Sequence, residues 1–149
     1  ARRLGCPLLV RGVGGLGPAP AAAQTHLASH PGAVGELRDI FEAGLRQRLT
    51  GVHLHSSQAP RLPNTSNFQL EGVDAQGAII LLDTQHICVS SGSACATGSI
   101  KPSHVLTALG LPTDKVRSSI RLGFGRYTMV DEIERAAHLI IDAADRQTG

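Results

Sequence analysis

Aromatic residues, lysines and long apolar runs are all scarce in this chain. Its 149 residues include no tryptophan, one tyrosine and three phenylalanines. The formal net charge is only +2, and the lysines and arginines are scattered along the sequence. This argues against nucleic-acid binding, which uses clustered basic residues and stacking aromatic side chains. No apolar run approaches the ~20 residues of a membrane-spanning helix, so the sequence predicts no membrane association.

Cysteines are few as well, and their spacing is not that of a disulfide framework. The chain has three, Cys6, Cys88 and Cys95, which is an odd number. This usage favours a reducing compartment and predicts a cytoplasmic protein. Hydrophobic residues make up 42% of the chain, which is enough to build the core of one domain.

The first 35 residues differ in composition from the rest. They are rich in alanine, glycine and proline, they include three arginines, and no acidic residue precedes Glu36. Such a composition is compatible with the remnant of a targeting peptide, which would make the protein organellar. We leave residues 1–35 unassigned and expect one domain over residues 36–149.

A glycine-rich motif lies within that unassigned segment. Residues Gly12 to Gly17 satisfy the pattern G-x-G-x-x-G after a short apolar run. In dinucleotide-binding proteins a helix follows this motif directly. Pro18 and Pro20 would interrupt that helix, so they weigh against a dinucleotide site.

Helical and strand periodicities alternate after residue 35 and predict an α+β fold. Apolar residues recur at helical spacing in some segments and alternate with polar residues in others. The expected architecture is a small antiparallel or mixed sheet with helices on one face. We expect helices over about 34–49, 74–82, 103–110 and 128–144, and strands over 52–55, 65–70, 87–89 and around Ile120.

A cysteine stands in a run of small residues, Ser90-Ser91-Gly92-Ser93-Ala94-Cys95. Such a segment bends easily and offers little apolar bulk to hide a thiol, so it predicts an accessible Cys95. An accessible thiol becomes a nucleophile only when it loses its proton. The candidates for that activation are His104, Lys101, a helix N-terminus near Pro102, or a cofactor. The alternative is that Cys95 is a small buried core residue.

Arginine 121 lies in a second informative segment. Ile120, Leu122 and Phe124 alternate with small or polar residues, which is the pattern of a half-buried strand. If these apolar residues face the core, Arg121 points the other way between small neighbours. Its guanidinium could then hold a carboxylate through two parallel hydrogen bonds. The alternative is an ordinary surface arginine in an ion pair.

A third hypothesis is a small metal site. His86, Cys88 and Cys95 carry imidazole and thiolate groups, which suit zinc or iron. The sequence shows no usual fourth ligand. We also expect Cys88 to be shielded in a strand between Ile87 and Val89, which weighs against this site.

Several motifs together resemble the C-terminal part of the group I cysteine desulfurases. These enzymes belong to the class V aminotransferase-like family that uses pyridoxal phosphate. The resemblance runs in order over most of the chain after residue 35. It rests on residues 61–67, 90–95, 101–106, 118–121 and 125–128.

This resemblance implies a fold, an activity and roles for two residues. The fold would be the small C-terminal domain of a homodimeric enzyme. Cys95 would attack the sulfur of an L-cysteine held as a pyridoxal-phosphate adduct, giving alanine and a persulfide, while Arg121 would bind the substrate carboxylate. The sulfur would pass to an iron–sulfur scaffold or another acceptor protein. Cys95 could then ligate a transient iron–sulfur cluster shared with that scaffold.

The lysine that holds pyridoxal phosphate in this family has no counterpart here. The chain has only two lysines, Lys101 and Lys115, and neither follows a histidine as the family's lysine does. We therefore expect no cofactor-binding residue in this chain, which resembles a C-terminal fragment that is inactive alone. The alternative is a non-enzymatic sulfur-carrier or interaction domain that keeps the fold.

Overall fold

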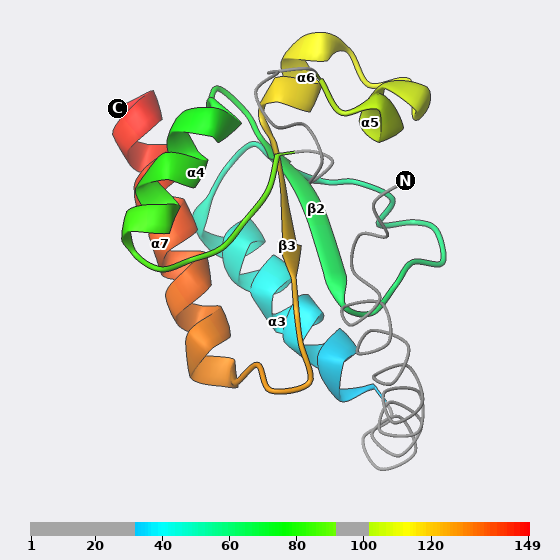
Figure 1. The fold of residues 1–149 in the computed structure, drawn as a ribbon, viewed down its shortest axis with the longest axis vertical. Coiled ribbons are helices and arrows are strands. Elements are labelled where there is room, and N and C mark those ends of the chain that lie inside the picture. Colours follow the sequence, from blue (N-terminus) through cyan, green and yellow to red (C-terminus); the bar gives the residue numbers. More distant parts are fainter. Residues whose placement is uncertain (1–31, 92–101) are drawn as a thin grey trace, which may run out of the picture. The chain divides into compact units, whose positions relative to one another are not determined.

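The computed structural model describes residues 32–91 and 102–149, and Figure 1 shows their arrangement. The chain divides into two units at residue 33, and the second unit, Val34–Gly149, contains the fold described below. The helices and strands in chain order are α3 (Ala33–Arg48), β1 (Val52–Leu54), β2 (Thr65–Leu70), α4 (Ala75–Thr84), α5 (His104–Ala108), α6 (Thr113–Arg117), β3 (Ser119–Gly123) and α7 (Val130–Thr148).

The three strands form one antiparallel sheet in the order β1-β2-β3. Phe68 in β2 pairs with Leu54 in β1 and with Ile120 in β3. This arrangement confirms the expected α+β fold with a small antiparallel sheet. It also confirms the strand predicted at residues 65–70.

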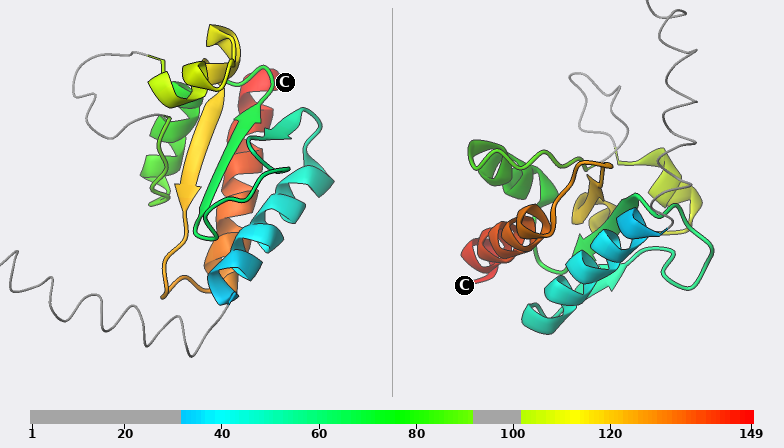
Figure 2. Two further views of the ribbon diagram at one scale, coloured as in Figure 1. Left: turned by 90° about the vertical axis from the view of Figure 1, so that its right-hand side faces the viewer. Right: turned by 90° about the horizontal axis from the view of Figure 1, so that it is seen from below.

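Helices α3, α4 and α7 cover one face of this sheet, as the two views of Figure 2 show. All three phenylalanines of the chain meet in the layer between them. The Phe41 ring lies 5.6 Å from the ring of Phe68 and 5.6 Å from that of Phe124, measured between centroids. Tilted and edge-on contacts of this kind are favourable for aromatic pairs. The three phenylalanines are therefore concentrated in the core, whereas the single tyrosine, Tyr127, is exposed.

The ends of α4 follow from local side-chain and backbone chemistry. Asp74 precedes the helix, and its Oδ2 accepts a hydrogen bond from the Gly77 N–H at 2.9 Å, as expected of an N-cap residue. At the other end, Ile87 N donates to Leu82 O and His86 N donates to Asp83 O. This is the Schellman pattern, and His86 takes the left-handed position with φ of 61°.

The strand expected at residues 87–89 is wrong. Among residues 87–91, only Ser90 makes a bridge to β3, through Arg121, and residues 87–89 belong to no strand. The backbone N–H of Ile87 already donates a hydrogen bond to Leu82 O at the end of α4, so it cannot join a strand ladder. Ile87 and Val89 pack against the core without joining the ladder, which explains the alternating pattern that suggested a strand.

Two further details of the expected helices need correction. The last helix begins at Val130, and Glu132 Oε2 accepts from the Met129 N–H at 2.9 Å. Thr128, where the helix was expected to begin, instead accepts a hydrogen bond from Gly125 N at 2.9 Å. Lys115 lies in the one-turn helix α6, which was not among the expected helices. The expected end of α5 at Gly110 is confirmed, because Gly110 has φ of 84°.

A buried ion pair attaches the connection between β1 and β2 to α3. Glu42 is only 5% exposed, and its two carboxylate oxygens accept from both Nη atoms of Arg61 at 2.7 and 2.6 Å. Ser66 Oγ adds a third hydrogen bond, donated to Glu42 Oε1 at 2.8 Å. These bonds raise the pKa of Arg61, and they hold the connection that leads into β2.

None of the described helices is long and apolar enough to cross a membrane.

Candidate functional site

The sheet has a second face, which α3, α4 and α7 do not cover and which carries polar residues. Asn67 lies directly opposite Arg121 in the register of β2 and β3. On its other side, Asn67 O accepts from His55 N at 2.9 Å, which continues the register of β1 by one residue. Ser90 exchanges two backbone hydrogen bonds with Arg121. Ser90, Arg121, Asn67 and His55 therefore form one row across the sheet, which we call the polar row.

Arg121 is positioned as the alternation of β3 predicts. Ile120 and Leu122 are 0% and 7% exposed and face the helices, whereas Arg121 is exposed on the opposite face. Its neighbours on that face are Ser119 and Gly123, which leave room around the guanidinium. The side chain makes no hydrogen bond or ion pair with another residue in the described parts of the chain. It is therefore available to bind an anion.

Asn67 was not singled out from the sequence, although a signal was present. Thr65, Asn67 and Gln69 alternate with Ser66, Phe68 and Leu70 in β2, which marks the first three as the second face of the strand. The side-chain Oδ1 of Asn67 is buried and accepts no hydrogen bond from the described residues. Buried polar atoms of this kind are uncommon in native proteins, so this one requires an explanation.

His55 closes the polar row on the β1 side. Its Nε2 lies 2.9 Å from Ser119 Oγ, and the Ser119 hydroxyl donates its own proton to Lys115 O at 2.7 Å. Because that hydroxyl has only one proton, it accepts from His55, so Nε2 carries the hydrogen of the neutral imidazole. Burial lowers the pKa of His55 and the nearby His53 lowers it further, which favours this neutral form.

The two ends of the segment that contains the predicted nucleophile line one hollow. Ser91 and Pro102 border a hollow of about 390 Å³ together with residues of α4 and α6. Gln76 also donates a hydrogen bond to Ser91 Oγ at 3.4 Å. Cys95 and Lys101 lie outside the described residues. His104, the predicted helper, is the exposed first residue of α5, and its role stays a prediction.

The histidine and cysteine of the metal hypothesis lie at the end of α4 and just after it. His86 takes the left-handed position that ends this helix. Cys88 is exposed, so the expectation that a strand shields it is wrong. Within residues 32–91 and 102–149, no three histidine, cysteine or acidic side chains are grouped to hold a metal ion.

The described residues do not fit a site that binds pyridoxal phosphate covalently. Such a site needs a lysine amine held in a desolvated environment. Lys115 is exposed on the short helix α6. No other lysine lies in the described ranges. The described residues therefore do not supply the lysine that would anchor the cofactor.

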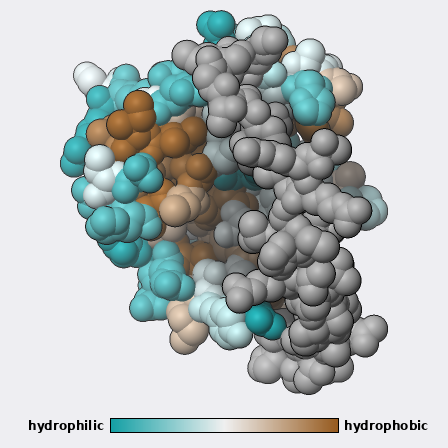
Figure 3. Space-filling view, in the orientation of Figure 1, coloured by the Kyte–Doolittle hydropathy of each residue, from teal (hydrophilic) through white to brown (hydrophobic). Residues whose placement is uncertain are grey.

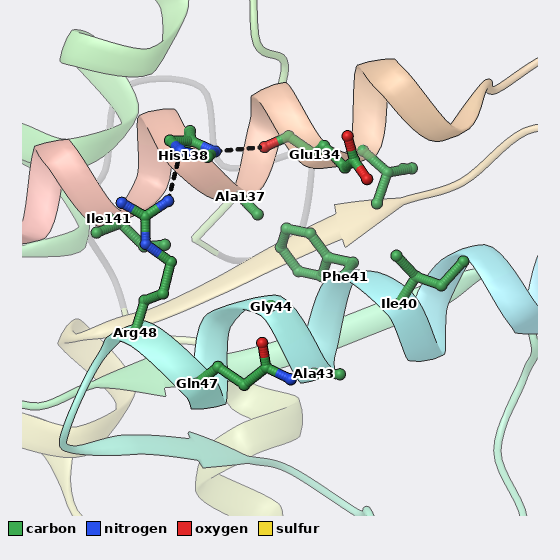
Figure 4. Close-up of a pocket in the computed structure, with 11 residues that line it drawn as sticks. Ile40, Phe41, Ala43, Gly44, Gln47, Arg48, Glu134, Ala137, His138 and Ile141 are labelled. Atoms are coloured by element: carbon green, nitrogen blue, oxygen red, sulfur yellow. Dashed lines mark hydrogen bonds between the residues drawn. The ribbon is translucent and has the colours of Figure 1, made fainter.

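A groove lies elsewhere, between α3 and α7. It has a volume of about 420 Å³ and is lined mostly by apolar residues, with Phe41 and Ile141 among them. Figure 4 shows Arg48 donating to His138 at its edge. Figure 3 shows further apolar surface over α4, where Ile80 is 66% exposed. These surfaces belong to the helix layer and not to the polar row.

Comparison with known proteins identifies the family. The sequence profile of the family described as "Aminotransferase class-V" matches residues 11–136, which is most of the chain. The chain therefore belongs to the aminotransferase class-V family. The match begins ahead of the boundary expected at residue 36, and the division into 1–35 and 36–149 stays a prediction.

Within that family the similar proteins are cysteine desulfurases. The chain is 34% identical to a cysteine desulfurase of Trichormus azollae over 92% of its own length and 34% of that protein. It is 36% identical to one of Enterobacter agglomerans, with the same coverage of both. It thus spans about a third of the length of these curated relatives.

A solved structure gives the same result. The NifS-like protein of Rickettsia africae superimposes with a TM-score of 0.65 and is 31% identical. The alignment covers 75% of this chain and 28% of that protein. The similarity to cysteine desulfurases expected from the sequence motifs is therefore confirmed, and so is the fold.

Proposed function

We propose that this chain forms the small, cysteine-bearing domain of a cysteine desulfurase. The overall reaction would consume L-cysteine and the Cys95 thiol and yield L-alanine and a Cys95 persulfide. The carbon–sulfur bond of the substrate breaks and a sulfur–sulfur bond forms on Cys95. In this proposal Cys95 is the nucleophile and Arg121 binds the substrate carboxylate.

The backbone pairing of Ser90 with Arg121 carries this proposal. Arg121 N donates to Ser90 O at 2.6 Å, and Ser90 N donates to Arg121 O at 3.0 Å. Cys95 follows Ser90 by five residues, and an extended chain of five residues spans at most ~18 Å. The segment that bears the thiol thus starts beside the proposed carboxylate-binding group. A thiol that must reach a substrate held by Arg121 needs this proximity.

Arg121 has the chemistry that a carboxylate requires. Its guanidinium offers a planar fork of N–H donors, which matches the two carboxylate oxygens. The exposed position in β3 leaves this fork unused by the other described residues. The small neighbours Ser119 and Gly123 allow a ligand to approach the sheet.

The proposed reaction also needs a cofactor and an acceptor for the sulfur. Pyridoxal phosphate would supply electron withdrawal from the substrate, and residues other than the described ones would hold it. The persulfide sulfur would pass to an iron–sulfur scaffold or another acceptor protein. Cys95 would ligate any cluster shared with the scaffold only during that transfer. We further propose that the protein acts as a homodimer in the cytoplasm.

A second candidate function is a sulfur carrier without its own desulfurase activity. It is favoured by the poor fit of the described residues to the cofactor, since Lys115 is exposed. In that case Cys95 would accept a persulfide sulfur from another protein. Arg121 would then have no substrate to bind.

The two functions differ in a direct assay. The natural polypeptide that carries this chain, taken at its full length, should release sulfide from L-cysteine when pyridoxal phosphate and a thiol reductant are supplied. The 149-residue chain alone should neither bind the cofactor nor release sulfide. A full-length polypeptide that is inactive, but whose Cys95 accepts sulfur from a separate persulfide protein, would favour the carrier function instead.

A further inference from the structure

The unpaired Oδ1 of Asn67 is a buried hydrogen-bond acceptor in the middle of the polar row. The backbone of Asn67 is engaged, because its carbonyl accepts from His55 N. No described neighbour supplies a donor to the side-chain oxygen. An acceptor that lacks a donor in the described fold suggests a partner that arrives with a ligand.

The register of the sheet makes Arg121 the nearest candidate donor. Hydrogen bonds between β2 and β3 fall on the even-numbered residues of β2, since Leu70 N donates to Ser118 O and Phe124 N donates to Asn64 O. Asn67 and Arg121 are therefore a non-hydrogen-bonded pair. In such pairs the Cα atoms approach to ~4.5 Å and the side chains lie closest together.

The number of donors on Arg121 allows a shared role. A guanidinium has five N–H groups, and a carboxylate held by two parallel bonds uses two of them. At least one more can reach across to an acceptor on the neighbouring strand. Such a bond would hold the guanidinium in one orientation while it binds the anion.

We propose that Asn67 is a positioning residue for Arg121, and that the two together form the subsite for the α-carboxylate of an amino acid. In the bound state, Arg121 donates two hydrogen bonds to the carboxylate and one to Asn67 Oδ1. The inference rests on the carboxylate role of Arg121 under the proposed function and adds a second residue to that site. It also explains why a buried acceptor is kept without a donor in the described fold.

The 149-residue chain itself permits a test, with L-alanine as the probe. L-Alanine has the α-carboxylate of the substrate but no thiol that could react with Cys95. The Arg121 Nε–Hε resonance would be followed by NMR during the titration, and L-alaninamide would serve as the probe without a carboxylate. We expect a saturable shift with L-alanine and none with L-alaninamide.

Asn67→Ala should weaken L-alanine binding about fivefold, the equivalent of one ordinary hydrogen bond. Asn67→Asp should weaken it more, because the new carboxylate would pair with Arg121 and repel the anion. Thr65→Ala is the matched control, since Thr65 lies in the same strand and on the same face but opposite Gly123. The control should bind as the parent chain does.

Thermal unfolding separates a positioning role from a structural one. Removing an unpaired buried oxygen should leave the melting temperature of Asn67→Ala equal to or above that of the parent. A lower melting temperature that accompanies weaker binding would overturn the positioning role. So would binding by Asn67→Ala or Asn67→Asp that equals the parent's, although the role of Arg121 would then stand. A parent chain with no saturable shift would instead overturn the carboxylate site and the role of Asn67 with it.

Discussion

The two faces of the sheet are built from alternate residues of the same strands, yet one face is buried in the core and the other carries polar side chains. Toward the helices, Phe68 and Ile120 are both 0% exposed and fill the core. On the other face, the Oδ1 of Asn67 and the guanidinium of Arg121 have no hydrogen-bond partner in the described parts of the chain. Stability and binding therefore depend on residues that are adjacent in sequence. Single substitutions should affect one property without the other.

The largest effect is expected on the helix-facing side, from Phe68→Ala. This ring contacts Phe41 and is fully buried, so its removal should leave a cavity and lower the free energy of unfolding by about 3–5 kcal/mol. Asn67→Ala, one residue away on the other face, should leave the free energy of unfolding unchanged or slightly higher. Urea unfolding of both variants provides the measurement. Equal losses in the free energy of unfolding would mean that the polar face contributes to stability as much as the core face does.

A smaller loss of stability is expected from Glu42→Ala. The change removes three hydrogen bonds to a buried carboxylate and leaves Ser66 and Arg61 without their acceptor. Because the Arg61 side chain is 19% exposed and can still reach water, we expect a loss of about 2–3 kcal/mol. Denaturant unfolding at low and high salt would measure it. A loss below about 1 kcal/mol would show that the ion pair contributes little.

On the polar face, Arg121→Ala should change binding rather than stability. Loss of the charge-assisted pair should weaken L-cysteine binding by the full-length enzyme by roughly 1.5–3 kcal/mol. Arg121→Lys should restore only part of this, because a point charge does not reproduce the two-pronged geometry. The measurement is the apparent Kd for L-cysteine in the three proteins. An unchanged Kd in Arg121→Ala would contradict the carboxylate role.

The smallest effect concerns the pH dependence of stability. The pKa of His55 is lowered in the folded protein by burial and by His53, so the unfolded chain binds a proton more readily. His55 therefore contributes stability that is present above the unfolded pKa of ~6.5 and is lost as the pH falls through the lower folded pKa. Thermal unfolding between pH 7.5 and pH 5 should show a shallower decline for His55→Asn than for the parent. Parallel declines would contradict this assignment.

The fold could be predicted largely from local patterns. Helical spacing located α3, alternation located β2 and β3, and Asp74 and Gly110 marked helix ends that the structure confirms. The expected strand at residues 87–89 failed because the same alternation arises when two apolar side chains pack without a strand partner. Whether a segment joins a ladder depends on neighbours that are distant in sequence.

The site could be predicted only in part for the same reason. The exposed position of Arg121 follows from the period of its own strand. Its pairing with Asn67 and Ser90 depends on the register between strands and on the course of the segment after α4, neither of which a local pattern specifies. The ion pair of the buried Glu42 likewise joins it to Arg61, 19 positions further along the sequence.

Under the proposed function, the polar row and the cysteine segment act together on L-cysteine. Mass spectrometry of the full-length polypeptide after brief incubation with L-cysteine and pyridoxal phosphate, followed by peptide mapping, tests this joint action. We expect the peptide with Cys95 to gain the mass of one sulfur atom, and we expect this gain to be lost in Cys95→Ala and much reduced in Arg121→Ala. A gain on Cys88, which is exposed, or a gain that is unchanged in Arg121→Ala would overturn the proposed roles of Cys95 and Arg121.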